Sequence, residues 1–360
     1  MTGKALVDSV LARKNTGKNP FWLGNPADET KLMYAKALGI SVEFFSGTSD
    51  SALYTSMNGI IDIELAKKTG GDMVWFTPEL DASSYRHPDN KPMWDCFKGE
   101  KRKSLLQAGV FAEVESVRDI EAFDWPNPEF IDLEKVYNDA VAANDAGLAV
   151  FGGMWSPFFH VLADFFGMDN YFMKMHTDPE IVLAATEHVV DFYLAANARC
   201  LDKMGHLLSA GFFGNDLGTQ RAMMISPECY NRFIHPYLKK IAALIKDYGL
   251  PVAIHCCGAI YDIIPSFIEL GVDVLHPLQA LAAGMAPENI QRDFGKDLVF
   301  MGGVDTQNLL PFGTVQDVEH KVAQLREIFG PNYIVSPSHE ALLPNVALEK
   351  VMAMSKAAKA

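Results

Sequence analysis

The sequence predicts a single (β/α)8 barrel, and three observations support this prediction. From about residue 70 onward, short apolar runs alternate with longer amphipathic stretches. Each run is almost continuously hydrophobic, as is typical of a parallel strand covered on both faces. The chain has no GxGxxG turn after a first strand, which favours a closed barrel over an open dinucleotide-binding sheet.

Seven apolar runs are the expected strands. An eighth is expected either within the first 70 residues or between residues 108 and 115. Strands separated by helices at this spacing need crossover connections and therefore form a parallel sheet. The runs are 72–77 (DMVWFT), 148–154 (LAVFGGM), 211–216 (GFFGND), 251–257 (PVAIHCC), 272–276 (VDVLH), 298–304 (LVFMGGV) and 333–338 (YIVSPS).

Capping residues indicate where several of the intervening helices begin and end. Ser226-Pro227 and Asp178-Pro179 each place a cap residue before a proline at the first helical position. Thr314 begins another helical stretch, which Gly330 ends. Residues 1–70 and 80–130 are expected to form helices and loops over the barrel mouth. Within them, the small and polar segment 47–59 (GTSDSALYTSMNG) is a candidate mobile cover.

Composition restricts the partners and the compartment. The formal net charge is −14 and no cluster of Lys and Arg is present, so nucleic acid and anionic membrane surfaces are poor partners. No segment has 18 consecutive apolar residues, and the first twenty residues lack the apolar core of a secretory signal. Five irregularly spaced cysteines are too few for a disulfide framework. We therefore expect a soluble protein of the reducing cytoplasm.

Reactive or polar side chains stand at the ends of most of the expected strands. In a (β/α)8 barrel the functional groups come from the carboxyl ends of the strands, where the loops form the open face. We therefore expect the active centre at that face. The strand-end residues are Asp216, His255, Cys257, His276, Asp305 and His339.

The sharpest of these signals is His255-Cys256-Cys257-Gly258. Alternate side chains of a strand share a face, so His255 and Cys257 are expected to point together while Cys256 points toward the helices. Imidazole nitrogen and thiolate sulfur are typical ligands of Zn²⁺. The alternative is a structural pair, in which a core histidine and a buried cysteine are each satisfied locally.

The remaining candidates are less specific signals, and alternative interpretations stay open for most of them. Asp216 is either catalytic or a helix cap, and His276, before Pro277, is either a ligand-binding or a structural histidine. His339 is a metal ligand, an acid or a hydrogen-bond donor. Asp305 is expected to contact a ligand because small residues precede it. The candidate catalytic residues are thus Asp216, Asp305 and His339, and the candidate substrate- or cofactor-binding residues are Trp155, Gln220, His276, Gln279, Gly302 and Gly303.

Four segments make the chain resemble the uroporphyrinogen decarboxylase superfamily of (β/α)8 barrels, over roughly residues 140–357. The resemblance implies one barrel domain over residues 1–360, with residues 1–70 as a helical extension packed on the barrel. The segments are 215–241 (NDLGTQRAMMISPECYNRFIHPYLKKI), 255–279 (HCCGAIYDIIPSFIELGVDVLHPLQ), 292–314 (RDFGKDLVFMGGVDTQNLLPFGT) and 333–354 (YIVSPSHEALLPNVALEKVMAM).

The superfamily contains two main chemistries. True decarboxylases act on a tetrapyrrole without metal, and carry an arginine-rich RQAGR segment and an aspartate within FSD. The corresponding places here read NPFWLGNPAD (19–28) and Phe76-Thr77-Pro78. An octa-anionic substrate needs cationic partners, which these segments lack. The zinc-dependent branch, which moves methyl groups between a corrinoid and a thiol, carries H-x-C-G, as residues 255–258 do here.

The resemblance to the methyltransferase branch implies a zinc site made by His255, Cys257 and His339. His339 falls where those enzymes carry a second cysteine. A methylcobalamin-type corrinoid would be the co-substrate, held on a separate corrinoid protein, beside a small-molecule substrate. The alternatives are a uroporphyrinogen decarboxylase with a remodelled substrate grip and a non-catalytic corrinoid- or tetrapyrrole-binding protein. A homodimer is a further hypothesis that the sequence leaves open.

Overall fold

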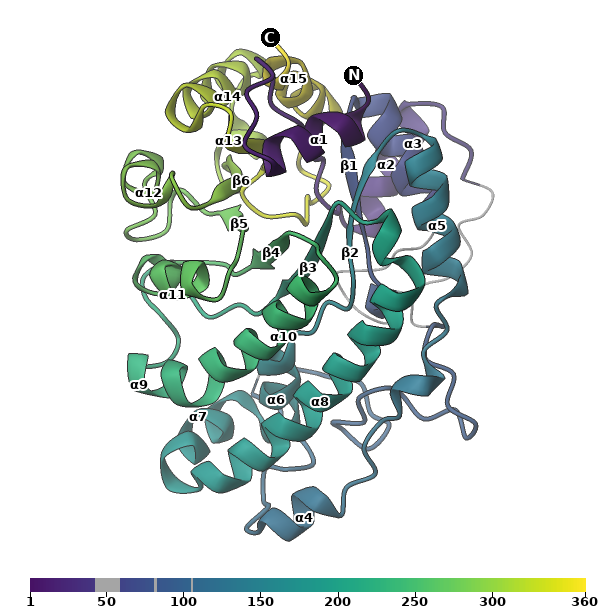
Figure 1. Cartoon of the computed structure of the whole chain (residues 1–360), viewed down its shortest axis with the longest axis vertical. Coiled ribbons are helices and arrows are strands. Elements are labelled where there is room, and N and C mark those ends of the chain that lie inside the picture. The colour runs from purple at the N-terminus through teal and green to yellow at the C-terminus, as the bar shows by residue number, and fades with distance from the viewer. Residues whose placement is uncertain (43–58, 81–82, 105) are drawn as a thin grey trace.

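The computed structural model describes residues 1–42, 59–80, 83–104 and 106–360 (Figure 1). The candidate cover at 47–59 lies outside the described residues except for Gly59. The predicted strands are confirmed as one parallel sheet in the order β1-β2-β3-β4-β5-β6-β7. Their bounds are Met73–Phe76 (β1), Ala149–Gly152 (β2), Ala210–Gly214 (β3), Val252–His255 (β4), Val274–Leu278 (β5), Val299–Val304 (β6) and Tyr333–Pro337 (β7).

The segment at residues 20–22 closes the barrel between β7 and β1. Trp22 N donates to Val335 O at 2.9 Å, and Val335 N donates to Pro20 O at 2.8 Å. On the other side, Asp72 N donates to Phe21 O at 2.8 Å. The eighth strand is therefore a short bridge in the first 70 residues, whereas residues 110–113 form turns.

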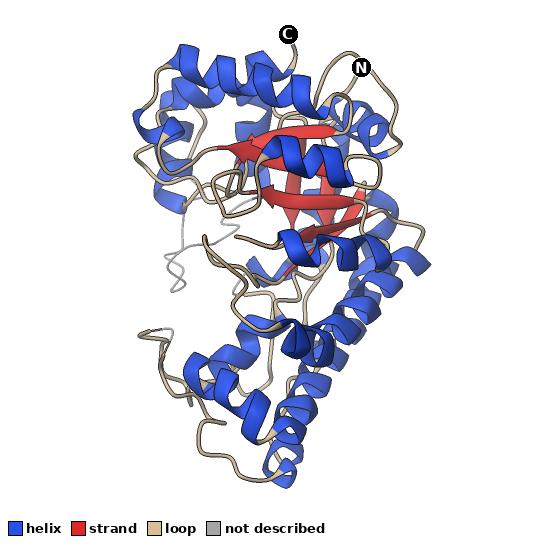
Figure 2. Cartoon of the chain, turned by 90° about the vertical axis from the view of Figure 1, so that its left-hand side faces the viewer, coloured by secondary structure: helices blue, strands red, loops and turns tan. Residues whose placement is uncertain are grey.

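Helices surround the sheet, as the capping residues predicted (Figures 1 and 2). Thr314 and Asp317 form a capping box at the start of α14, and the Ser226 hydroxyl caps α9. The helices outside the barrel include α2 (Asp28–Ala37), α3 (Gly59–Thr69), α5 (Glu134–Asp145), α8 (Pro179–Met204), α9 (Pro227–Cys229), α10 (His235–Asp247), α11 (Ile264–Glu269), α12 (Pro287–Phe294), α13 (Leu309–Phe312), α14 (Val315–Phe329) and α15 (Leu348–Ala358).

The first helix, α1 (Gly3–Leu11), lies at the amino ends of the strands. Its Lys4 N donates to Gly147 O, just before β2, at 2.8 Å. Val7 and Val10 are buried in the core inside the barrel, beside Trp22 of the closing segment. The expectation that the N-terminal extension covers the carboxyl face is therefore wrong for α1. Its apolar stripe instead fills the opposite end of the barrel.

The loops after β1 and β2 build a helical extension beyond the barrel, which forms the lower half of Figure 1. It contains α4 (Val117–Glu121), α6 (Phe158–Phe166), α7 (Met168–Thr177) and part of the long α8. Phe111, Phe123, Trp125 and Phe165 pack their rings together in it, with Phe111 and Phe165 stacked at 4.7 Å. This extension forms one wall of the cavity described below.

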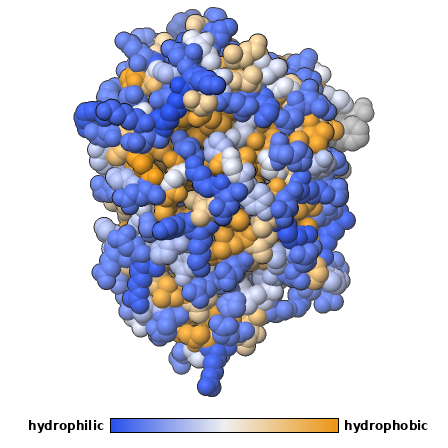
Figure 3. All heavy atoms as spheres, in the orientation of Figure 1, coloured by the Kyte–Doolittle hydropathy of each residue, from blue (hydrophilic) through white to orange (hydrophobic). Residues whose placement is uncertain are grey.

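Hydrophilic side chains cover much of the face shown in Figure 3, with apolar side chains between them. Among the helices that the structure describes, none has both the length and the hydrophobicity needed to cross a membrane.

Candidate active site and metal centre

Three potential metal ligands converge where β3 and β4 end. We call Asp216, His255 and Cys257 the ligand cluster, because their ligand atoms all lie within 4.8 Å of one another. The Cys257 Sγ is 3.2 Å and an Asp216 oxygen is 3.1 Å from His255 Nε2. Cys256, in contrast, is fully buried in the core outside the sheet, so the predicted alternation of the two cysteines is confirmed.

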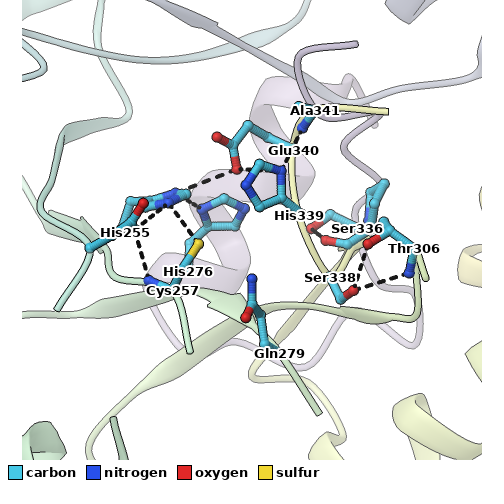
Figure 4. Close-up of polar contacts among 12 residues, drawn as sticks. His255, Cys257, His276, Gln279, Thr306, Ser336, Ser338, His339, Glu340 and Ala341 are labelled. Carbon is cyan, nitrogen blue, oxygen red and sulfur yellow. Dashed lines mark hydrogen bonds and ion pairs between the residues drawn. The ribbon is translucent and has the colours of Figure 1, made fainter. Parts of the chain in front are cut away.

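A second layer supports the other side of the His255 ring (Figure 4). His255 Nδ1 lies 3.0 Å from Nδ1 of His276 and 3.5 Å from an oxygen of Glu340. His276 and Glu340 are both buried. Partners of this kind fix the orientation of an imidazole whose other nitrogen binds a metal. The arrangement therefore leaves Nε2 of His255 directed at Asp216 and Cys257.

The electrostatics of the cluster favour a cation. Burial and the nearby carboxylates of Asp216 and Glu340 raise the pKa of Cys257 well above its ordinary value. Burial lowers the pKa of His255, but Glu340 and Asp216 outweigh burial and raise it. A divalent cation would offset these buried negative charges and stabilise the thiolate. The nitrogen, sulfur and oxygen donors also match the ligand types that zinc takes.

Asp216 also belongs to the wall of a cavity. Burial opposes its ionisation, yet His255 holds the pKa of Asp216 well below its usual range. One of its oxygens accepts a hydrogen bond from Cys257 N at 2.9 Å, and the other lies 3.9 Å from His160 Nε2. Asp216 is thus an ionised carboxylate at the strand ends. Its contacts with Cys257 N and His255 join two strand-end loops, and neither of them caps a helix.

His339 lies beside the ligand cluster on its other side. Its ring is perpendicular to that of His255, with the centroids 6.2 Å apart. Its Nδ1 accepts a hydrogen bond from Ala341 N at 3.1 Å and is 3.8 Å from an oxygen of Glu340. Among the described residues, the ligand groups that converge within 4.8 Å do not include His339. Its role as the third metal ligand stays a prediction.

A cavity of about 390 Å³ opens above the ligand cluster. Its walls are mostly aromatic and apolar, and they join the barrel to the helical extension. Trp155, a predicted pocket residue, packs edge-on against His255 with ring centroids 5.1 Å apart. We call this space the aromatic cavity, and its lining residues are Trp75, Glu79, Met93, Trp94, Trp155, Pro157, His160, Val161, Tyr193, Gly214, Asp216, His255 and Glu340.

A second cavity, of about 330 Å³, lies on the His339 side and is more polar. Gln220 Nε2 donates to the Gln279 side-chain oxygen at 2.7 Å, and the same oxygen accepts from Gly258 N at 3.1 Å. The loops after β3, β4 and β5 are therefore tied together at its floor. We call it the polar cavity, and its lining residues are Gln220, Gln279, Ala280, Leu281, Pro287, Gly303, Asp305, Thr306, Gln307, Lys321, Ser338 and His339.

Two of the remaining predicted residues, Asp305 and Gly302, have structural roles in the barrel. Asp305 accepts hydrogen bonds from Gln307 N, Asn308 N and Leu309 N, which caps the start of α13. Gly302 has a φ of +131°, and a Cβ there would lie 2.4 Å from Leu278 N, so this glycine accommodates the register shift between β5 and β6. A catalytic role for Asp305 and a ligand-binding role for Gly302 stay predictions.

Sequence reasoning missed two acidic residues of the site. Glu340 follows His339 directly, yet a single Glu after a strand is usually a surface residue. Glu79 directly follows Pro78, the place compared with the FSD aspartate of decarboxylases. Its carboxylate accepts hydrogen bonds from Ser156 N at 3.2 Å and from the Thr77 hydroxyl at 2.8 Å. The only available signal was its position shortly after a strand end.

The family model described as Uroporphyrinogen decarboxylase (URO-D) matches residues 107–360. The chain belongs to the URO-D family. The segment compared with the arginine-rich substrate grip, residues 19–28, here contains the strand that closes the barrel. This segment lies outside the residues that the family model matches.

Known relatives of this URO-D family member are methyltransferases. The chain is 24% identical over 209 residues to the methylcobamide:CoM methyltransferase MtbA of Methanosarcina mazei. This alignment covers 58% of each of the two chains. It is 26% identical over 171 residues to MtbA of Methanosarcina acetivorans, covering 48% of this chain and 47% of the relative. The chain thus spans about half the length of the curated relatives it matches.

A solved structure shares the fold over nearly the whole length. A methyltransferase from Methanosarcina mazei superimposes with a TM-score of 0.70, covering 99% of this chain and 98% of that chain. The sequence identity is 13%, so this likeness concerns the fold. It agrees with the barrel architecture predicted from the alternating strands and helices.

Proposed function

We propose that this URO-D family member is a zinc-dependent methyltransferase that moves a methyl group between a corrinoid protein and a thiol or similar small acceptor. The convergence of Asp216, His255 and Cys257 at the open face is the observation that carries this proposal. The methyltransferase names of the relatives support it.

The ligand cluster supplies the residues that would hold the metal. His255 offers Nε2, Cys257 its sulfur and Asp216 a carboxylate oxygen, and we keep His339 as a further ligand or acid reached from the polar cavity. Zinc bound there would lower the pKa of a coordinated thiol or hydroxyl, so that its anion forms near neutrality. Glu340 and His276 hold the imidazole of His255 in place for this task.

The two cavities suit a transfer between two reactants. His339 and Glu340 are neighbours in the chain, but His339 lines the polar cavity and Glu340 the aromatic cavity. Two reactants could therefore approach the ligand cluster from different sides. We propose that a separate corrinoid protein presents its methylcobalamin-type cofactor at this face, while a small molecule occupies one cavity.

The walls of the cavities argue against uroporphyrinogen decarboxylation. Among the described residues, no Lys or Arg lines the aromatic cavity, and Lys321 is the one Lys or Arg of the polar cavity. An octa-anionic tetrapyrrole needs several cationic partners to offset the loss of hydration of its carboxylates.

The two adjacent cysteines provide a matched test. Elemental analysis of protein purified without added metal should give about one equivalent of zinc for the wild type and for Cys256→Ala, and a much smaller amount for Cys257→Ala. The wild type and Cys256→Ala should also transfer the methyl group of methylcobalamin to small thiols. The loss of the methylcobalamin absorption band measures this transfer.

Less than about a tenth of an equivalent of zinc in the wild type, unchanged in Cys257→Ala, would contradict the metal assignment. Tight binding of methylcobalamin without transfer to any thiol would instead favour the non-catalytic corrinoid-binding alternative.

A further inference from the structure

We propose that the aromatic cavity binds a small organic cation of the methylated-ammonium class, as the charged part of the small-molecule substrate. The place of this cation in a methyl transfer rests on the proposed function. The binding itself rests on the walls of the cavity, which combine several large aromatic rings with carboxylates and include no Lys or Arg among the described residues.

Four aromatic residues from different parts of the chain meet in this cavity. Trp75 lies on β1, Trp94 in the loop after it, Trp155 after β2 and Tyr193 on α8. Trp75 and Trp155 have ring centroids 4.7 Å apart at 53°, and Trp94 and Tyr193 are 5.4 Å apart at 52°. Both pairs are tilted, as in the adjoining walls of a box. A cation within about 6 Å of such ring centroids is attracted by their negative faces.

The polar atoms of the Trp94–Tyr193 pair already form hydrogen bonds within the protein. Trp94 Nε1 donates to the Tyr193 hydroxyl at 3.1 Å, and the Tyr193 hydroxyl also interacts with the Glu79 carboxylate. The only indole donor of Trp94 is therefore occupied, and Trp94 contributes its ring to the cavity wall. This arrangement favours a ligand that is recognised by ring contact and charge, without many hydrogen bonds.

The charged side chains around the cavity favour a cationic ligand over an anionic one. Its lining includes the carboxylates of Glu79, Asp216 and Glu340, and no described Lys or Arg. The chain outside the described ranges, residues 43–58, 81–82 and 105, also contains no Lys or Arg. Away from the ligand cluster, an anion entering this space would meet the Glu79 carboxylate without a Lys or Arg beside it among the described residues, which is energetically costly.

Glu79 is the carboxylate best suited to a ligand cation. It is separate from the ligand cluster, and the backbone N–H groups of Trp155 and Ser156 hold it in one orientation. Burial raises the pKa of Glu79 to about 7, and the main groups that oppose this rise are neutral hydrogen-bond donors, among them Trp155 N and Ser156 N. A bound ammonium group would supply the missing positive charge. The rings and Glu79 together thus form a site for an organic cation.

A pair of probes that differ only in charge tests this inference. Choline and 3,3-dimethylbutan-1-ol have nearly the same shape, but the alcohol has carbon in place of the quaternary nitrogen. Each probe is titrated into the zinc-loaded protein, and binding is measured by tryptophan fluorescence and by calorimetry. Choline should bind at least about ten-fold more tightly than the alcohol. Glu79→Gln and, separately, Trp94→Leu should reduce this preference to within about three-fold.

Glu100→Gln is the matched control, because Glu100 is exposed and pairs with Lys103 outside the cavity. It should keep the full preference for choline. Circular dichroism establishes that each variant is folded, and the wild-type comparison decides the matter even if one variant is not. Equal or tighter binding of the neutral alcohol, or no detectable choline binding, overturns the inference.

The outcome is independent of the test for methyl transfer. Choline binding by a protein without zinc or turnover would leave this inference standing and remove the proposed function. Zinc-dependent methyl transfer to thiols, with no preference for the cationic probe, would do the reverse.

Discussion

The imidazole of His255 is used on both of its edges. Nε2 lies beside Asp216 and Cys257, and Nδ1 lies beside His276 and Glu340. A residue with both nitrogens engaged is oriented by one set of partners and available as a ligand to the other. The roles of these partners can be separated by changing the residues on one edge alone.

Glu340→Gln is expected to weaken zinc binding by about 10- to 100-fold, because the amide no longer stabilises the ligand imidazole with a full negative charge. Competition with a chromophoric chelator measures this affinity. Glu319→Gln is the control, since Glu319 pairs with Lys356 on the surface. A zinc affinity within about two-fold of the wild type would show that Glu340 does not support the metal site.

Glu79 is expected to make the stability of the metal-free protein depend on pH. Its pKa is raised from 4.5 to about 7 by burial. Between these values the folded protein holds a proton that the unfolded chain has lost, so stability falls as the pH rises from about 4.5 through about 7. The loss is at most about 3 kcal/mol.

Urea unfolding of the wild type and of Glu79→Gln, at about pH 5 and about pH 8, measures this contribution by difference. The Gln variant should lose less stability over this interval, because it has no carboxyl to ionise. The same change in both proteins would mean that Glu79 titrates normally.

Two elements determine the geometry at the open end of the barrel, namely the end of β4 and the closing segment. The end of β4 directs Cys257 inward and Cys256 outward, because side chains alternate along an extended chain. The closing segment at residues 20–22 joins β7 to β1 with very few hydrogen bonds, so the barrel depends on side chains at this seam. Asp72 is the most important of them. Its carboxylate accepts from Phe21 N at 2.8 Å and lies 3.1 Å from Lys359 Nζ.

Asp72→Ala is expected to lower the free energy of unfolding by about 2–3 kcal/mol, because the buried N–H of Phe21 would lose a charged acceptor. Urea unfolding measures the change. Asp8→Ala on α1, where Asp8 forms an exposed pair with Lys4, should stay within about 0.5 kcal/mol of the wild type. A similarly small effect of Asp72→Ala would mean that the closing segment is held by packing alone.

On the scale of the whole molecule, the two ends of the barrel have different tasks. The amino ends are filled by Val7 and Val10 of α1, which contribute to the core. The carboxyl ends hold the ligand cluster between two cavities, and the helical extension adds an aromatic wall to one of them. We therefore expect the buried carboxylates at this end to make the stability of the whole protein depend on a bound cation.

Removal of zinc is therefore expected to destabilise the whole chain. A ligand at about 100 times its Kd stabilises the folded state by about 2.7 kcal/mol, and chelation removes this contribution. Urea unfolding with zinc and with a chelator measures the difference. Cys257→Ala should show almost no response to zinc, and an equal response in this variant would place the metal elsewhere.

Local patterns in the chain were sufficient for the barrel and for part of the site. Parallel strands are buried on both faces and therefore read as apolar runs, and each predicted run contains most of one observed strand. The side chains that follow these strands meet because all carboxyl ends lie at one face. Hence Asp216, His255 and Cys257 were found together, although Asp216 is 39 positions from His255 in the sequence.

Other parts of the site could not be predicted in this way. The sequence does not show whether a lone glutamate is solvated or buried, so Glu79 and Glu340 looked like surface residues. Trp94 reaches the cavity only because the loop after β1 folds back over the barrel. The position of α1 was also undetermined, since an apolar stripe shows that a helix is buried but not against which surface.

The sequence by itself determined the fold class, the inward direction of Cys257 and the end of the barrel where chemistry collects, because strand periodicity is a local property of the chain. The tertiary structure decided which carboxylates surround His255, which rings enclose the aromatic cavity and where α1 packs. These depend on contacts between residues far apart in the chain, and local periodicity carries no information about such contacts.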